Sequence, residues 1–353
     1  MILNPLNKLF LKRLSFKRPA FLIFICIWVF TGCSSTKTLE SIEDQEIQYS
    51  LISVIHADAN YLFHENGVSK KADKVALKKL IALAEKAEHG EVFIFHQKPE
   101  RRAFLFFPKK DRVYYHYKNG ILVNSGKYSP TDGGFTKESE LYKALSQNPT
   151  SQKTYFAYFG HEIPTFTNRA YHRSSPEMEF STEIFSNHLQ SFSSDIALTI
   201  LSTCNNGSPL MMERLKDVTQ TVIASPQNLH LSYLSLDKFE LLESKPQIST
   251  HILADSIAQD SFSKLSSFLQ TMVTVAVYSL DETRDYTTAL SLKYEQHLKS
   301  VKAKPLFTNN ADCKNIELLD SVMDTTGVNI YFKPASFGRK AGDSTHSGWG
   351  CKD

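Results

Sequence analysis

The sequence is poor in long apolar stretches, and its first 19 residues contain no acidic residue. The apolar block "AFLIFICIWVF" at residues 20–30 is shorter than the roughly 20 residues that a membrane-spanning helix needs. No internal repeat or low-complexity tract stands out, and the oxygen-ligand spacing of a recognised calcium loop is missing. We therefore expect no required cofactor and no metal site. Calcium binding is left open as an alternative that no motif supports.

Five basic residues precede the apolar block, and small residues follow it. Thr31 and Gly32 stand directly before Cys33 in "FTGCSS", which resembles a bacterial lipoprotein signal. Residues 1–32 are therefore predicted to be a signal peptide, with Cys33 carrying the lipid after cleavage. An uncleaved signal anchor is the alternative. The resemblance implies a lipid-anchored protein of the cell envelope, on its periplasmic or surface face.

Loss of this segment changes the charge of the chain, because it holds five basic residues and no acidic one. The formal net charge falls from +3 to −2, so a nucleic-acid partner is not indicated. Residues 33–46 are polar and suit a tether between the lipid and a folded body. We divide that body into a core at residues 47–235 and a C-terminal α/β extension at residues 236–353, packed on the core.

Cysteine is scarce, with five residues in the precursor. Cys26 leaves with the signal peptide and Cys33 carries lipid, which leaves Cys204, Cys313 and Cys351 in the body. Outside the cytoplasm an odd number suggests one disulfide and one thiol. A disulfide between Cys313 and Cys351 would leave Cys204 as the thiol, and the alternative is that all three are reduced.

Apolar strand patterns alternate with helical patterns along most of the chain. The alternation predicts a doubly wound, mostly parallel sheet with helices on both faces. One stretch breaks the rhythm and indicates an antiparallel hairpin at the sheet edge, with its turn at "KNG". The predicted strands are in 49–63, 91–97, 154–160, 196–202 and 220–225, the hairpin in 102–128, and the helices at 71–88 (stopped by Gly90), 136–147 (capped by Thr136), 181–192 and 209–218, with a packing helix and strand within 261–277.

Two chemically capable side chains follow predicted strands. His161 comes directly after one strand, and Cys204 comes two residues after another. Ligands of open α/β sheets bind outside the carboxyl ends of the strands, where such loops converge. Asn205–Gly207 provides a turn after the cysteine, and Ser208-Pro209 has the pattern of a helix start. A nearby imidazole and a helix N-terminus both favour the thiolate, so Cys204 is a candidate nucleophile.

At several positions the chain resembles the clostripain-like cysteine peptidases. The resemblance rests on "ISVIHADANYL", "TYFAYFGHEIP", "TILSTCNNG", "LMMERLKDV", "VIASPQN" and "GVNIYFKP". It implies a caspase-like α/β fold with a C-terminal elaboration, and a cysteine endopeptidase acting on peptides or proteins. It also implies that Cys204 is the nucleophile and His161 the general base and acid, with an oxyanion hole formed by the backbone N–H groups of Cys204 and Glu162.

The sequence departs from the family pattern at two positions. Glu162 stands where the family has a glycine, and Ser202 stands where it has an acidic residue near the specificity pocket. Ser202 and Ser225 are assigned to substrate binding, with a preference that is not clearly basic. Some relatives are cleaved internally, and the basic stretch at residues 168–173 is the candidate place for this.

Both departures also suit a second hypothesis, a catalytically inactive binding or scaffold lipoprotein with the same fold. The remaining polar clusters receive structural interpretations. Glu138, Glu140 and the acidic residues of 281–285 are predicted to lie on a solvated face. The aromatic run "YYHY" at residues 114–117 is predicted to be a half-buried edge strand.

Overall fold

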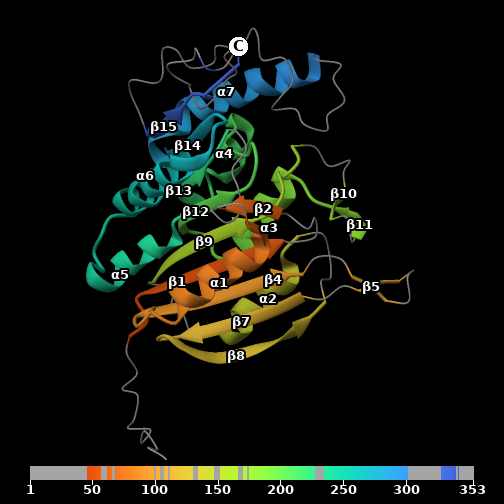
Figure 1. Ribbon diagram of the computed structural model, residues 1–353, viewed down its shortest axis with the longest axis vertical. Coiled ribbons are helices and arrows are strands. Elements are labelled where there is room, and N and C mark those ends of the chain that lie inside the picture. Colours follow the sequence, from red (N-terminus) through yellow and green to blue (C-terminus); the bar gives the residue numbers. More distant parts are fainter. Residues whose placement is uncertain are drawn as a thin grey trace, which may run out of the picture. The chain divides into compact units, whose positions relative to one another are not determined.

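A nine-stranded sheet forms the centre of the protein in the computed structural model (Figure 1). Five central strands run parallel to their neighbours, and two antiparallel strands extend the sheet on each side. The order across the sheet is β15 (Val328–Lys333), β14 (Val273–Ser279), β13 (Thr219–Ala224), β12 (Ile196–Ser202), β9 (Lys153–Phe159), β1 (Tyr49–His56), β4 (Gly90–Gln97), β7 (Arg112–Lys118) and β8 (Ile121–Tyr128). The predicted α/β class is confirmed, with a sheet that is parallel in its centre and antiparallel at both margins.

The structure describes part of the chain, all of it within a unit that spans Asp44–Asp353. The signal peptide, the lipidation site Cys33, most of the tether and the Cys313–Cys351 disulfide fall outside the described residues, so those expectations stay predictions. The described residues are 46–56, 62–65, 68–98, 101–103, 107–109, 112–129, 134–146, 152–165, 170–172, 175–226, 234–300, 327–338 and 341.

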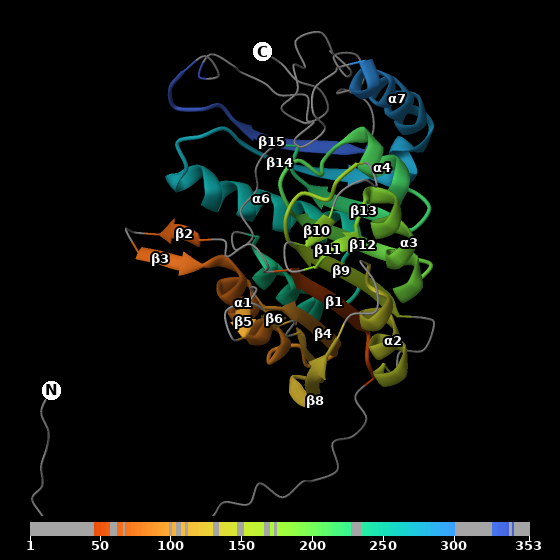
Figure 2. The same ribbon diagram turned by 90° about the vertical axis from the view of Figure 1, so that its right-hand side faces the viewer.

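Helices cover both faces of the sheet (Figure 2). One face carries α1 (Ala72–Ala84), η1 (Leu236–Phe239), α5 (Glu240–Ser244) and α6 (Thr250–Phe268). The other carries α2 (Thr136–Leu145), α3 (Thr182–Phe192), α4 (Pro209–Leu215) and α7 (Leu280–Ser300). Short hairpins lie outside the main sheet: β2 (Leu62–Glu65) with β3 (Val68–Lys71), β5 (Arg101–Ala103) with β6 (Phe107–Lys109), and β10 (Ala170–His172) with β11 (Ser175–Glu179).

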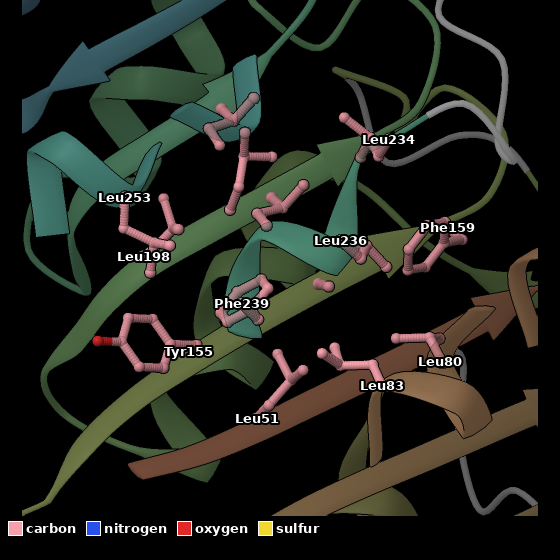
Figure 3. Close-up of a cluster of buried hydrophobic side chains, with 14 of the residues drawn as sticks. Leu51, Leu80, Leu83, Tyr155, Phe159, Leu198, Leu234, Leu236, Phe239 and Leu253 are labelled. Atoms are coloured by element: carbon pink, nitrogen blue, oxygen red, sulfur yellow. The ribbon is translucent and has the colours of Figure 1, made fainter. Parts of the chain in front are cut away.

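The central strands are apolar on both sides because both of their faces are covered. In β1, Leu51 and Ile55 face one hydrophobic cluster, and Ile52 and Val54 face the other. Figure 3 shows the first cluster, in which Leu80 of α1 and Phe239 of η1 lie over the sheet. Burial of this kind contributes about 25 cal/mol per Å² of apolar surface. Among the described residues, no helix is both long enough and apolar enough to span a bilayer.

Several element ends differ from the sequence prediction. The helix α1 ends at Ala84, so Gly90 does not stop it and instead begins β4. Thr136 is the first residue of α2 and not its N-cap, which is Phe135. The predicted hairpin is confirmed as β7 and β8, because Asn119 and Gly120 form its turn with φ of 49° and 77°. The run "YYHY" lies in β7, one strand inside the edge strand β8.

The prediction of a solvated Glu138 is wrong. Its side chain is 1% exposed, forms an ion pair with the buried Arg112, and accepts a hydrogen bond from Tyr128 Oη at 2.8 Å. Two causes raise the pKa of Tyr128 well above its usual value: burial, which has the larger effect, and the nearby negative charge of Glu138. The phenol therefore stays protonated and acts as a hydrogen-bond donor. Glu140, in the same helix, is exposed and pairs with Lys137 at 2.8 Å.

The segment after residue 235 continues the main sheet. The strand β14 pairs antiparallel with β13, with Thr221 opposite Ser279, and β15 pairs with β14. The helix predicted within residues 261–277 belongs to α6, and the strand predicted there is β14. Tyr49 Oη donates to Glu243 Oε1 at 2.7 Å, which attaches α5 to the first strand of the core. The C-terminal segment is therefore integrated into the same layers as the core.

Candidate functional site

The loops that carry His161 and Cys204 leave neighbouring strand ends. The strands β9 and β12 are adjacent and parallel, with Phe159 in register with Ser202. The pairing continues one step further, because Gly160 N donates to Ser202 O at 3.3 Å. His161 and Cys204 each stand two residues beyond the last register pair. Since adjacent strands lie about 4.8 Å apart, the two loops start side by side at the same sheet edge.

The order of the strands identifies this edge as a place for a site. From β1 the chain passes through α1 to β4 on one side, whereas from β9 it passes through α3 to β12 on the other side. The helices α1 and α3 also cover opposite faces of the sheet. In open α/β sheets the crevice for a ligand forms where this reversal occurs, at the carboxyl ends of the strands. Here that point lies between β1 and β9, and His161 follows β9.

The amide of Asn206 joins the two loops. Its Oδ1 accepts from Ile163 N at 2.8 Å, and its Nδ2 donates to Ile163 O at 3.0 Å. Both residues are buried, with Asn206 3% exposed and Ile163 1% exposed. One planar side chain therefore satisfies both backbone groups of a residue in the neighbouring loop.

A second side-chain contact lies next to the first. Asn205 Nδ2 donates to Glu162 Oε2 at 2.8 Å, and Asn205 adopts a left-handed conformation with φ of 56° that asparagine tolerates better than most residues. Asn119 and Asn205 are the non-glycine residues with positive φ in the described part of the chain. Glu162 is not among them, so its backbone conformation does not require glycine.

Gly207 fixes the other side of the Cys204 loop. Its N–H donates to Ser225 O at 2.8 Å, and its carbonyl accepts from Tyr278 Oη at 3.2 Å. A Cβ atom at this position would lie 2.7 Å from Pro226 N and 2.8 Å from the carbonyl carbon of Ser225. Because these are backbone atoms that cannot turn away, only glycine fits, and the loop is fastened to the end of β13 and to β14.

The candidate side chains differ in burial. Cys204, His161 and Glu162 are half-buried, whereas Ser202 and Ser225 are fully buried at 0% exposure. The thiol is therefore not sealed inside a strand. It lies in the bend after β12, and α4 begins five residues later with Ser208 Oγ accepting from Met211 N at 3.3 Å. The predicted strand–turn–helix arrangement around Cys204 is confirmed.

Other predicted features of the site are less complete. The basic stretch at residues 168–173 is predicted to be a loop. Its residues Ala170–His172 form the strand β10, and its other residues lie outside the described part of the chain. Within the described ranges, no group of three or more His, Cys, Asp or Glu side chains is arranged to hold a metal ion. Substrate-binding roles for Ser202 and Ser225 stay predictions.

Sequence reasoning missed the function of Asn206 in this site. The run "NNG" indicates a turn, which is present, but its second asparagine is also the link to Ile163. The two residues are 43 positions apart. No local pattern marks such a contact, because it depends on how β9 and β12 are paired.

No family model and no curated protein matches the chain. Among the solved structures that are similar to it are three structures of C11, or clostripain-like, cysteine proteases. A secreted C11 protease from Bacteroides thetaiotaomicron has 10% identity and a TM-score of 0.49, over 72% of this chain and 71% of that one. A structure of a secreted C11 protease from the same organism with an irreversible peptide inhibitor has 12% identity and a TM-score of 0.47, over 71% and 70%.

The third is an inactive zymogen C11 protease from Parabacteroides distasonis, with 9% identity and a TM-score of 0.46, over 72% of this chain and 66% of that one. At such identities and TM-scores the likeness concerns the path of the chain. The function is therefore inferred from the residues of the site.

Proposed function

We propose that this protein is a clostripain-like cysteine endopeptidase with a Cys204–His161 dyad. The observation that carries the proposal is the placement of the two loops, which leave register-paired ends of adjacent parallel strands and are linked by Asn206. The half-buried Cys204 and His161 are positioned at this edge, and both lie outside the packed core. A Cys/His hydrolase needs at least a thiol as the nucleophile and an imidazole as the general base, and here both follow neighbouring strand ends.

In the proposed reaction, His161 takes the proton of the Cys204 thiol, and the thiolate attacks the carbonyl carbon of the scissile peptide bond. The negative charge then develops on the carbonyl oxygen, which accepts hydrogen bonds from the backbone N–H groups of Cys204 and Glu162. His161 returns its proton to the leaving amine as the C–N bond breaks, which leaves a thioester. Water activated by the imidazole hydrolyses this thioester and restores the thiol.

The expected cleavage preference is not clearly basic. The position where the family has an acidic residue is occupied by Ser202, and its fully buried hydroxyl carries no charge to pair with lysine or arginine. Ser202 and Ser225, at the ends of β12 and β13, are proposed to contact the substrate. Neither a cofactor nor calcium is part of the proposed reaction, and internal cleavage is proposed at residues 168–173.

A non-catalytic binding or scaffold protein is the second candidate. It is favoured by Glu162, whose carboxylate is bonded to Asn205, the residue directly after Cys204. A negative charge in that place opposes the developing charge of an oxyanion. The two candidates differ in the reactivity that they predict for the Cys204 sulfur.

Labelling with a thiol-directed peptide probe distinguishes these candidates. We expect an acyloxymethyl ketone peptide to label the wild-type protein covalently and to leave the Cys204→Ala variant unlabelled, as measured by intact mass. Iodoacetamide, which needs no peptide recognition, serves as the control reagent. Equal labelling of the wild type and of Cys204→Ala by the peptide probe would contradict the peptidase proposal and would favour the non-catalytic binding or scaffold protein.

We further propose that the mature protein is anchored in the cell envelope through lipid on Cys33. The support is the sequence alone, namely the basic start, the short apolar block and the small residues before Cys33. We expect Cys33→Ser to move the protein from the membrane fraction to the soluble fraction and to prevent incorporation of a palmitate analogue. Cys26→Ser, seven residues earlier, is the matched control and should remain lipidated. Membrane retention of an unlabelled Cys33→Ser protein would support the uncleaved anchor instead.

A further inference from the structure

Three hydrogen-bonded links join the loop after β9 to the loop after β12. At the base, Gly160 N donates to Ser202 O at 3.3 Å. Further out, Asn205 bonds Glu162 at 2.8 Å, and Asn206 bonds both backbone groups of Ile163. In the loop after β9, His161 stands between the base link at Gly160 and the outer links at Glu162 and Ile163. In the loop after β12, Cys204 stands between the base link at Ser202 and the outer links at Asn205 and Asn206.

We infer that the loop clasp, defined as Asn205 and Asn206 with their partners Glu162 and Ile163, positions His161 relative to Cys204 for proton transfer. The inference rests on the proposed function and extends it to residues that do not react. Asn205 and Asn206 are thus positioning residues, acting through the loops that they join.

Asn206 is the main member of the loop clasp because its amide is bidentate. An acceptor and a donor on one planar group bond the N–H and the C=O of the same residue, which fixes the orientation of the loop as well as its distance. Asn206 is 3% exposed, so water cannot readily replace its hydrogen bonds to Ile163. Alanine removes both bonds. Aspartate keeps an acceptor for Ile163 N but places a carboxylate oxygen against Ile163 O.

The loop clasp is held firmly from the other side. Gly207, the next residue, is hydrogen-bonded to Ser225 and Tyr278, so Asn206 has a fixed position beside the end of β13 and the Tyr278 side chain of β14. Ile163 in turn packs in the hydrophobic cluster that contains Phe180 and Phe185. The clasp therefore joins two anchored segments, and its loss should let the loop of His161 move relative to Cys204.

Displacement of a reacting group by about 1 Å costs on the order of 100-fold in rate. We therefore expect Asn206→Ala and Asn206→Asp to lower kcat by about 10- to 100-fold, with KM changed less than about twofold, because the substrate subsites are untouched. The substrate for this measurement is a fluorogenic peptide identified by library cleavage profiling. Asn329→Ala, which removes an exposed asparagine bonded to Asp255, is the control and should match the wild type.

A merely structural asparagine would not change the chemistry of the thiol. The rate of Cys204 alkylation by iodoacetamide is therefore measured against pH in each variant. We expect the Asn206 variants to have a profile closer to that of an isolated thiol, because the imidazole no longer stabilises the thiolate. Circular dichroism confirms that the variants are folded.

Unchanged kcat and an unchanged alkylation profile in folded Asn206 variants would overturn the inference while the peptidase proposal stands. A wild type without Cys204-dependent hydrolysis or probe labelling would overturn both. If the Asn206 variants do not fold, Asn205→Gly is the deciding variant, because glycine tolerates the φ of 56° and the substitution removes the hydrogen bond to Glu162. We expect it to lower kcat about threefold or more, and full activity would contradict the loop clasp.

Discussion

Replacing Cys204 with alanine is expected to lower the rate of peptide hydrolysis by at least about 10⁴-fold, because no other group in the proposed mechanism can form the thioester. His161→Ala should lower kcat by roughly 10²- to 10⁴-fold, the range for loss of a general base and acid. Both are measured with the profiled fluorogenic peptide. His251→Ala removes an exposed histidine of α6 and should leave kcat unchanged.

The two variants are also expected to be non-additive. If Cys204 and His161 act as one unit, the double variant should hydrolyse the peptide no more slowly than Cys204→Ala alone. Retention of more than about a tenth of the wild-type rate in Cys204→Ala would mean that hydrolysis comes from another source. Strict additivity of the two losses would contradict the dyad.

The second large effect is expected in α2, where Glu138→Gln should lower the free energy of unfolding by about 3–5 kcal/mol. The substitution leaves the Arg112 guanidinium, 2% exposed, as a buried charge without its carboxylate partner. Glu140→Gln is the matched control two residues away, because its side chain is exposed and its pair with Lys137 should contribute no more than about 0.5 kcal/mol. Urea denaturation measures both.

A double variant separates two effects on the free energy of unfolding. One is the destabilisation caused by leaving one buried charge without its partner, and the other is the net contribution of the intact ion pair. Arg112→Met with Glu138→Leu removes both charges, and buried ion pairs replaced in this way are often as stable as the original. We expect it to be more stable than Glu138→Gln. A stability loss below about 1 kcal/mol in Glu138→Gln would show that Arg112 reaches water when its partner is removed.

The sequence was sufficient to predict the central layers of the fold. The strand predicted at residues 196–202 agrees with β12 at both ends, because a mostly apolar run bounded by polar residues marks a strand that is buried on both faces. Element ends were less predictable: Gly90 marks the start of β4 and not the end of α1. Glycine is required at position 90 because the ring of Tyr49 leaves no room for a Cβ atom there. Tyr49 belongs to another strand, β1, so the local sequence around Gly90 does not reveal this contact.

The burial of Glu138 could not be predicted from its own segment. Acids in the first turn of a helix are ordinarily solvated, and the local pattern treats Glu138 and Glu140 alike. They differ because Arg112 and Tyr128, from β7 and β8, cover only Glu138. In the candidate site the same distinction applies: the strand-end positions of His161 and Cys204 follow from local patterns, whereas the link from Asn206 to Ile163 depends on strand pairing.

The hydrogen bond from Tyr278 to the carbonyl of Gly207 makes the reactive edge dependent on the last third of the chain. Tyr278 belongs to β14, so a shortened chain ending at residue 235 would lose this hydroxyl together with the strand that flanks β13. The turn after Cys204 would then be open on one side. Whatever chemistry this edge performs, the smallest fragment able to perform it must extend at least through β14.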